Sequence, residues 1–242
     1  MFYVFEVLYF SYGVILIPFL SLLRLFSKRA SLKLSAIIAS KWARDTLKFI
    51  TKDIKVINRD LIPKDSHYIV VANHLSVLDI TLLLGFLSKD IIFIAKKELK
   101  KVFPIGIWVW LIGGVFINRE SLRGAIESFK KASEEYKKYS KPLIIFPEGT
   151  RSETGKVGEF KKGSFKLAYM NKAKILPVTI YGTDKLMKKG TLKFNKNVSV
   201  GMVIHEPIDI SGLDRNELKL IPKKVEDIVK KTKESLDETG KI

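Results

Sequence analysis

Cysteine is absent from this 242-residue chain, and histidine is scarce. Without cysteine there is no disulfide, no thiolate nucleophile and no Cys-ligated metal. The three histidines, His67, His74 and His205, stand far apart in the sequence, which argues against a metal site built from histidine. The sequence therefore predicts neither a metal nor a cofactor, and it leaves the redox compartment of the protein open.

Acidic residues are the minority among the charges, because 43 Lys and Arg stand against 25 Asp and Glu, for a formal net charge of +18. A field of this sign favours anionic partners such as nucleic acid, lipid headgroups or an acidic carrier protein. The basic residues are mostly lysine, and the chain lacks the arginine clusters, zinc-ligand spacings and helix-turn-helix pattern of nucleic-acid binders. We therefore expect no nucleic-acid partner.

The segment from Phe2 to Phe26 is strongly apolar, and it carries no charge between Val7 and Leu23. A membrane-spanning helix needs about 20 apolar residues, so this segment is borderline, and Pro18 is expected to kink it. It lacks the basic start and the small-residue cleavage site of a signal peptide. Basic residues follow it instead, as expected beside lipid headgroups. We expect a membrane-associated helix, either spanning the bilayer or entering one leaflet.

The next segment, Ser31 to Ile50, has the spacing of a basic amphipathic helix. Such a helix could lie on a membrane, with Trp42 at the interface, or it could pack on a catalytic domain with its charged side in solvent. We interpret residues 1–50 as a membrane-docking pair of helices and residues 51–242 as an α/β domain.

From Asp53 onward, short apolar runs alternate with helical patterns. This alternation predicts an α/β fold with a central, largely parallel sheet flanked by helices. The aromatic-rich segment 98–112 is expected to be helical and broken at Pro104, and it could pack in the core, line an acyl pocket or lie against lipid. The expected strands are Ile54–Ile57, Tyr68–Ala72, Ile91–Ala95, Val115–Ile117, Leu143–Phe146, Ile175–Ile180 and Val198–Ile204. The expected helices run from about Ser76 to Leu87, Ser121 to Tyr139, Gly163 to Asn171, and from about Ile221 onward.

The junction after the second strand holds the most suggestive titratable pair, His74 and Asp79. A neutral imidazole is the usual proton acceptor near pH 7, and a carboxylate on its other ring nitrogen fixes the tautomer. The five-residue separation suits this contact if His74 precedes the helix and Asp79 lies in its first turn. Ser76 and Asp79 also match a capping box, which would explain the aspartate without catalysis. The pair alone leaves both interpretations open.

Polar groups follow two further strands, at Arg119 and at Glu148 to Arg151. Ligands of α/β sheets bind beyond the carboxyl ends of the strands, so His74, Arg119, Glu148 and Arg151 are expected to line one crevice. A base beside two guanidinium groups suits an anionic substrate whose hydroxyl must lose a proton. Taken singly, each residue has a structural explanation, namely a turn with an ion pair or a solvated strand end.

Two neighbours of Glu148 add to this picture. Gly149 permits close approach of the backbone to a ligand, and Thr150 offers a hydroxyl and an amide. Together with Arg151 they form a polar loop that begins at the end of a strand.

Five short blocks follow one another between about residues 54 and 204. They are Asn73-His74 with Asp79, Gly113 to Arg119, Phe146 to Ser152, Phe160 to Gly163, and Ile175 to Val178. In their order and separation these blocks resemble those of the glycerolipid acyltransferases. One departure is Leu75, which stands where the family often has a polar or small residue. Within the family, Glu-Gly-Thr-Arg-Ser looks most like the 1-acylglycerol-3-phosphate acyltransferases. Together the blocks favour catalysis over capping for His74.

The resemblance implies a membrane-bound enzyme without a cofactor. It would move a fatty acyl group from acyl-carrier protein or coenzyme A to the sn-2 hydroxyl of lysophosphatidic acid, at the cytoplasmic face of the inner membrane. His74 would be the general base and Asp79 would orient it. The phosphate and glycerol site would comprise Arg119, Glu148, Gly149, Thr150, Arg151 and Lys161. The alternatives are another lysophospholipid or amino-lipid acceptor and, more remotely, a basic membrane-binding protein without catalysis.

Overall fold

A seven-stranded sheet in the order β1-β7-β6-β2-β5-β3-β4 organises the computed structural model. The structure describes residues 2–65, 67–88, 90–117, 122–139, 141–188, 190–191 and 193–239. The strands are β1 Asp53–Ile57, β2 Tyr68–Ala72, β3 Ile92–Lys96, β4 Val115–Ile117, β5 Leu143–Ile145, β6 Lys174–Tyr181 and β7 Ser199–Ile204. Every expected strand is present, so the predicted α/β fold is confirmed.

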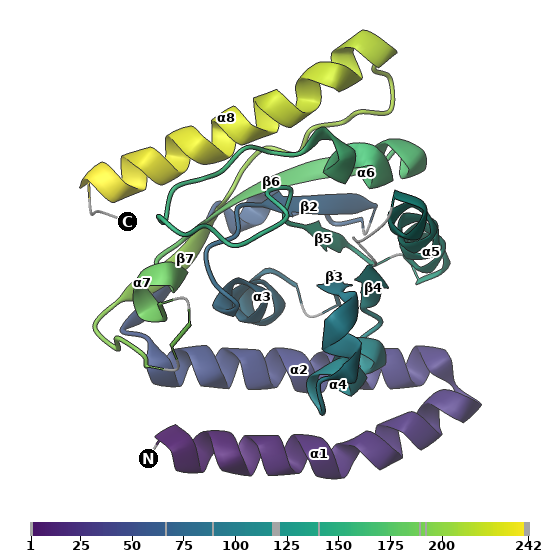
Figure 1. Ribbon diagram of the computed structural model, residues 1–242, viewed down its shortest axis with the longest axis vertical. Helices are drawn as coiled ribbons and strands as arrows, with labels where there is room; N and C mark the ends of the chain where they lie inside the picture. Colours follow the sequence, from purple (N-terminus) through teal and green to yellow (C-terminus); the bar gives the residue numbers. More distant parts are fainter. Residues whose placement is uncertain are drawn as a thin grey trace.

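The helices cover both faces of this sheet (Figure 1). They are α1 Phe2–Phe26, α2 Lys28–Ile50, α3 Leu78–Leu82, α4 Ile105–Leu111, α5 Leu122–Tyr139, α6 Lys166–Asn171, α7 Thr183–Leu186 and α8 Arg215–Thr239. Short 3-10 segments add η1 Arg59–Leu61, η3 Lys97–Lys101 and η4 Lys162–Phe165, and α3 continues as a π-helical turn, η2, over Leu83–Leu87. The expected helix over 98–112 is divided at Pro104 into η3 and α4, as its proline predicts.

Strand β2 lies at the centre of the sheet, between β5 and β6, and pairs in parallel with both. All five of its residues are buried, as expected for a strand with helices on both faces. Val70 and Ala72 belong to the core that α2 and α3 cover, whereas Ile69 and Val71 belong to the core that includes residues of α5, α6 and α8. The single antiparallel pair, β6 with β7, makes β7 and its parallel neighbour β1 run opposite to the other five strands.

The last helix, α8, begins at Arg215, earlier than the expected start near Ile221. A reciprocal capping box explains the difference. The Asp214 side chain accepts from the amide of Glu217 at 2.9 Å, and the Glu217 side chain accepts from the amide of Asp214 at 2.7 Å. This arrangement satisfies amides that would otherwise lack partners at the start of the helix.

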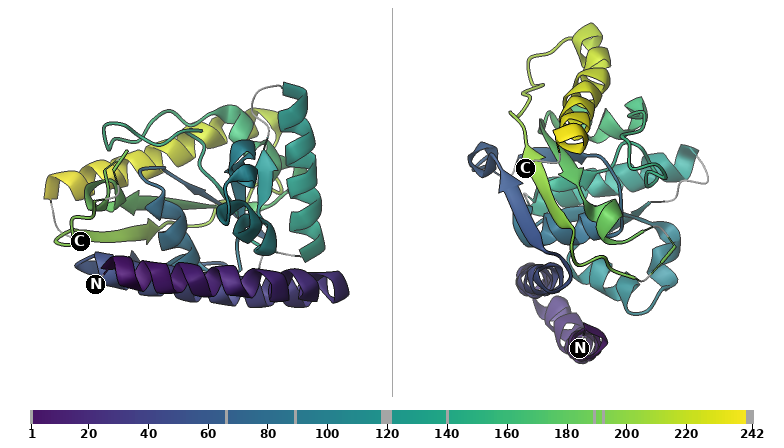
Figure 2. Two further views of the ribbon diagram at one scale, coloured as in Figure 1. Left: turned by 60° about the horizontal axis from the view of Figure 1, so that its bottom comes forward. Right: turned by 90° about the vertical axis from the view of Figure 1, so that its left-hand side faces the viewer.

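The two amino-terminal helices differ in their surroundings. Ala43, Leu47 and Ile50 of α2 are part of the main core, and Trp42 packs against it. Of the two arrangements expected for this helix, α2 therefore packs on the α/β domain. The division of the chain at residue 50 into a membrane-docking part and an α/β domain stays a prediction. Helix α1 lies along the outer side of α2, away from the sheet (Figures 1 and 2). Among the helices of the described residues, none has the length and hydropathy needed to cross a bilayer.

Candidate active site

His74 and Asp79 meet at the carboxyl end of β2. The loop from Asn73 to Val77 carries the histidine, and the first turn of α3 carries the aspartate. The Nδ1 atom of His74 lies 2.8 Å from Oδ2 of Asp79. Because an ionised carboxylate only accepts hydrogen bonds, Nδ1 carries the hydrogen and Nε2 presents its lone pair. The histidine side chain is 17% exposed and the aspartate side chain 0%, so the imidazole reaches solvent while its partner is sealed.

Asp79 serves two structural purposes at once. Its Oδ2 accepts from the backbone amides of Leu75 at 2.6 Å and Ser76 at 2.9 Å, besides facing His74. The contact with Ser76 is the aspartate's half of a capping box. The two interpretations of this segment are therefore compatible, because one carboxylate both caps the turn and holds the imidazole. The other oxygen, Oδ1, accepts a short hydrogen bond from the hydroxyl of Thr183.

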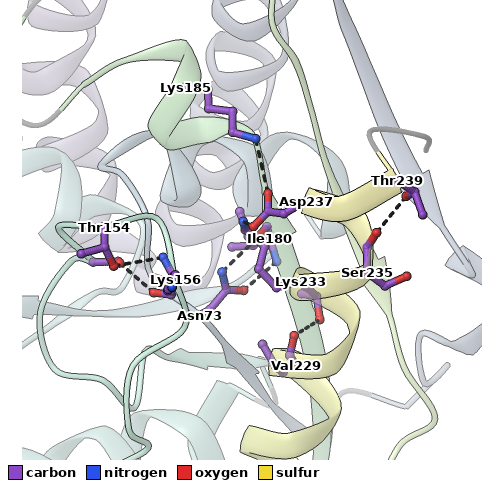
Figure 3. A network of polar contacts seen from close by, with 12 residues as sticks. Asn73, Thr154, Lys156, Ile180, Lys185, Val229, Lys233, Ser235, Asp237 and Thr239 are labelled. Carbon is purple, nitrogen blue, oxygen red and sulfur yellow. Dashed lines mark hydrogen bonds and ion pairs between the residues drawn. The ribbon is translucent and has the colours of Figure 1, made fainter.

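Asn73 ties the end of β2 to the neighbouring strand β6. Its side-chain nitrogen donates to the carbonyl of Ile180 at 3.0 Å, and its oxygen accepts from the amide of Ile180 at 2.7 Å (Figure 3). The asparagine is fully buried. This two-way contact fixes the backbone immediately before His74 relative to the strand that leads to Thr183.

Residues that follow β5 hold His74 from the other side. The ring of Phe146 stacks on the imidazole, with centroids 4.1 Å apart and an angle of 15° between the planes. The backbone amide of His74 donates to Oε1 of Glu148 at 2.8 Å, and the His74 carbonyl accepts from the amide of Ser152 at 2.8 Å. The imidazole is thus placed by its own ring contacts and by both polar groups of its peptide unit.

Glu148 is predominantly buried, and both of its oxygens are engaged. Besides the His74 contact, Oε2 accepts from the amide of Gly158 at 3.0 Å. Burial raises the pKa of this carboxyl, and the two backbone hydrogen bonds oppose that shift. The glutamate therefore joins β5, the His74 segment and the far side of the loop from 147 to 163, hereafter the polar loop.

The predicted cations lie on or beside this polar loop. Gly149 adopts φ +76°, in the left-handed region that glycine tolerates, and a Cβ there would lie 3.0 Å from Nζ of Lys161. Thr150 is exposed and Arg151 half-buried. The Arg151 guanidinium forms no hydrogen bond or ion pair with any residue that the structure describes. The remaining predicted residue, Arg119, falls outside the described residues.

Glu226 of α8 holds the distal part of the polar loop, and sequence reasoning missed it. Its Oε2 accepts from the amide of Phe160 at 2.8 Å, and its Oε1 pairs with Nζ of Lys223 at 2.8 Å. Burial raises the pKa of Glu226, but the bonds to Lys223 and Phe160 outweigh burial and leave the pKa lowered. The helical spacing of α8 could have flagged Glu226, because it falls between the buried residues Val225 and Val229.

The two other histidines make structural contacts away from this site. Nε2 of His67 lies 3.1 Å from the carbonyl of Asn171, and Nε2 of His205 lies 2.8 Å from the hydroxyl of Thr179. Burial lowers the pKa of His205 to about 4. In the described part of the chain, no three His, Asp or Glu side chains gather into a set suited to a metal ion.

Comparison with known proteins shows the family to which this chain belongs. The family model described as "Acyltransferase" matches residues 53–181, more than half of the chain. A 1-acyl-sn-glycerol-3-phosphate acyltransferase of Borreliella burgdorferi is 34% identical over 179 residues, which are 74% of this chain and 71% of that protein. The Saccharomyces cerevisiae protein of the same name is 34% identical over 177 residues, 72% of this chain and 58% of its own.

A solved structure matches the fold over nearly the whole chain. It is the crystal structure of the 1-acyl-sn-glycerophosphate (LPA) acyltransferase PlsC from Thermotoga maritima, with a TM-score of 0.77 and 35% sequence identity. The match covers 98% of each chain. It therefore includes α1 and α2, which lie outside the stretch that the family model matches.

Proposed function

The chain belongs to the acyltransferase family, and from that premise we propose that it transfers a fatty acyl group from a thioester to the 2-hydroxyl of lysophosphatidic acid, forming phosphatidic acid. The observation that carries this proposal is the contact between Nδ1 of His74 and the sealed carboxylate of Asp79, 2.8 Å long, at the carboxyl end of the central strand. The names of the relatives supply the acceptor and product.

His74 acts as general base. Its Nε2 takes the proton of the 2-hydroxyl while that oxygen attacks the thioester carbonyl carbon. The tetrahedral intermediate collapses, the carbon–sulfur bond breaks, and the imidazolium returns the proton to the departing thiolate. Asp79 stabilises the imidazolium because its Oδ2 faces Nδ1. No acyl-enzyme forms, in keeping with a chain that contains no cysteine.

The polar loop binds the phosphate of the acceptor. Arg151 has no partner among the described residues and is half-buried, so its guanidinium is available for a phosphate at small desolvation cost. Lys161 lies next to Gly149 and contributes a second positive charge. Thr150 and the Gly149 backbone complete this anionic subsite, to which Arg119 is assigned by motif. Glu148 orders the loop through its bonds to His74 and Gly158.

The thioester donor is acyl-carrier protein or acyl-coenzyme A. Both are anionic, and both suit a protein of net charge +18. Turnover measured separately with each thioester identifies the donor.

A comparison of two variants tests the chemistry. With lysophosphatidic acid in vesicles and a labelled thioester, His74→Ala is expected to lose at least about 100-fold in kcat. The control is His205→Ala, because the His205 ring contacts the Thr179 hydroxyl and forms no hydrogen bond with His74, Asp79 or the polar loop among the described residues. If His74→Ala retained most of the activity, His74 would be excluded as the general base. If another lysophospholipid or an amino-lipid were acylated faster in the same assay, lysophosphatidic acid would be excluded as the preferred acceptor.

The protein docks on one face of a membrane through α1. Five exposed apolar side chains recur on this helix at helical spacing and form one stripe. They are Ile15, Phe19, Leu22, Leu25 and Phe26. A stripe of this size without a protein partner among the described residues fits insertion among lipid acyl chains.

The stripe on α1 continues toward α4. The guanidinium of Arg24 lies 4.2 Å from the ring centroid of Trp110 and donates to the carbonyl of Leu111 at 3.3 Å. Around this joint Phe103 and Trp110 are exposed, and exposed lysines precede them in η3. Aromatic rings with basic neighbours are typical of the membrane interface. Core packing, an acyl pocket and contact with lipid were the three roles considered for segment 98–112. Contact with lipid is the role that suits its exposed side.

The absence of cysteine makes this docking easy to measure, because one introduced cysteine gives one labelled site. An environment-sensitive fluorophore on Phe19→Cys or Phe103→Cys should brighten and shift to the blue with vesicles that contain anionic phospholipid. The matched control is Leu220→Cys, which is equally exposed but lies on α8, at the opposite side of the molecule (Figure 1). An equal response at all three positions would contradict docking through α1 and α4.

A further inference from the structure

Among the described residues, Thr183 supplies the one hydrogen bond to Asp79 that comes from a distant part of the chain. The bonds to His74, Leu75 and Ser76 all fall on Oδ2, and all come from the segment beside the aspartate. Oδ1 accepts from the Thr183 hydroxyl, 104 positions later in the sequence. Both Asp79 and Thr183 are 0% exposed, so water has no access to replace this donor.

Three features place the hydroxyl at this point. Asn73 clamps Ile180 of β6 through two hydrogen bonds (Figure 3). Gly182 then turns the chain with φ +80°, and a Cβ there would lie 2.3 Å from the carbonyl oxygen of Ser199, so only glycine fits. The turn delivers Thr183 as the first residue of α7, which a Lys185–Asp237 contact of 3.3 Å connects to α8 (Figure 3).

We propose that Thr183 is a positioning residue for the reaction, acting through Asp79 on His74. Its hydrogen bond holds Oδ1, and this fixes the rotation of the carboxylate so that Oδ2 faces Nδ1. It also offsets part of the negative charge that burial makes costly. Among the described residues, Thr183 itself forms no hydrogen bond with His74 or with the polar loop. The inference rests on the proposed role of His74 as base.

Replacement of the hydroxyl at constant shape gives the first test. Thr183→Val is expected to lower kcat by about 10-fold or more, because a buried carboxylate loses a charge-assisted hydrogen bond. The KM values for acceptor and thioester should stay within about twofold, since no substrate contact is removed. Thr183→Ser keeps the hydroxyl and should restore kcat to within about threefold of the unmodified protein.

Thr179→Val is the matched control. Thr179 lies on β6, four residues before Thr183, is also 0% exposed, and contacts His205 through its hydroxyl instead of Asp79. A purely structural effect of removing a buried threonine hydroxyl would lower the activity of both valine variants alike. The proposal requires that only the Thr183 variant lose kcat.

A double-mutant cycle tests whether Thr183 acts through the aspartate. Once Asp79→Asn has been made, adding Thr183→Val should lower kcat by no more than about twofold further. Equal effects of Thr183→Val in both backgrounds would overturn the proposal, as would an unchanged kcat in the folded single variant. If Thr183→Val does not fold, Thr183→Ala takes its place, since it also removes the hydroxyl and places no methyl group against Oδ1.

The same variants separate this inference from the function on which it depends. Full activity in His74→Ala and Asp79→Asn would contradict the assignment of His74 as the base, independently of the result for Thr183→Val. Loss of activity in those two variants, with full kcat in folded Thr183→Val, would contradict the role of Thr183 and leave the assignment of His74 intact.

Discussion

The proposed catalytic pair, His74 and Asp79, lies beside the polar loop, yet the polar groups of the two parts differ in burial and in hydrogen bonding. Asp79 is sealed from water, and the structure gives partners to both of its oxygens. Arg151 is half-buried without a partner among the described residues, and Lys161 is exposed. The difference teaches that the proposed base is held in place by the protein alone, whereas the cations of the proposed phosphate site are left available for an anion.

The two parts are not independent, because Glu148 connects them. One of its oxygens holds the His74 amide and the other holds the Gly158 amide of the polar loop. The proposed phosphate site is therefore connected mechanically to the backbone of His74, the proposed base. Substitutions on either side, and at the connection itself, measure how far the two parts act separately.

The largest effect is expected at the sealed carboxylate. Asp79→Asn should lower kcat by about 100-fold or more, because the amide cannot stabilise an imidazolium as a carboxylate does. KM for the acceptor should change little, since the polar loop is untouched. Steady-state kinetics on vesicles checks this. An Asp79→Asn enzyme with normal kcat would show that the aspartate only caps α3.

Arg151→Ala should have the opposite signature. Loss of a charge-assisted contact to phosphate is expected to lower kcat/KM for lysophosphatidic acid by about 10- to 100-fold, mostly through KM. The matched control is Arg59→Ala, because Arg59 is an exposed arginine that follows β1, an outer strand separated from β2 by β7 and β6. An equal loss with an acceptor that lacks a phosphate would show that Arg151 does not read that group.

Glu148→Gln tests the connection. A glutamine offers only one carbonyl oxygen to the two amides, so we expect about 1–3 kcal/mol less stability against urea and a moderate fall in kcat. If Glu148 instead binds the glycerol directly, stability will be nearly unchanged and KM for the acceptor will rise. Unfolding and kinetic measurements on the same preparation distinguish these outcomes.

The smallest effect is expected at His205, outside both parts. Burial holds its pKa at about 4, below the ordinary 6.5, so the ring stays neutral in the folded protein while it protonates in the unfolded chain. Its contribution to stability is present above pH 6.5 and is lost as pH falls from 6.5 toward 4. Between pH 7 and pH 5 the loss should be about 1 kcal/mol, after allowance for partial exposure. Urea unfolding of His205→Gln should show a correspondingly smaller difference between these two pH values.

The sequence predicted the central parts of this molecule well where the signals are local. The strand before Asn73 was identified from its uninterrupted apolar run, and that run is buried on both faces. The contact between His74 and Asp79 followed from a five-residue separation at a strand–helix junction. Such signals are readable because the interacting atoms lie within one turn of the chain.

Contacts between distant segments were not predictable in the same way. Nothing in the residues near position 183 indicates that a threonine will meet Asp79, because that meeting requires β6 to lie beside β2. Glu226 was overlooked for the same reason, since its partner amide belongs to the polar loop. The amphipathic pattern of α2 was also ambiguous, because a helix that packs on a sheet and one that lies on a membrane need the same spacing.

The sequence by itself determined the α/β alternation, the family and the identity of the residues proposed for catalysis, because each depends on a short pattern that one strand or one turn contains. Only the tertiary structure decided that α2 is a core helix, that Glu148 faces two backbone amides, and that Thr183 completes the surroundings of Asp79. These outcomes depend on which strands become neighbours, and strand order is a property of the whole sheet that no local segment encodes.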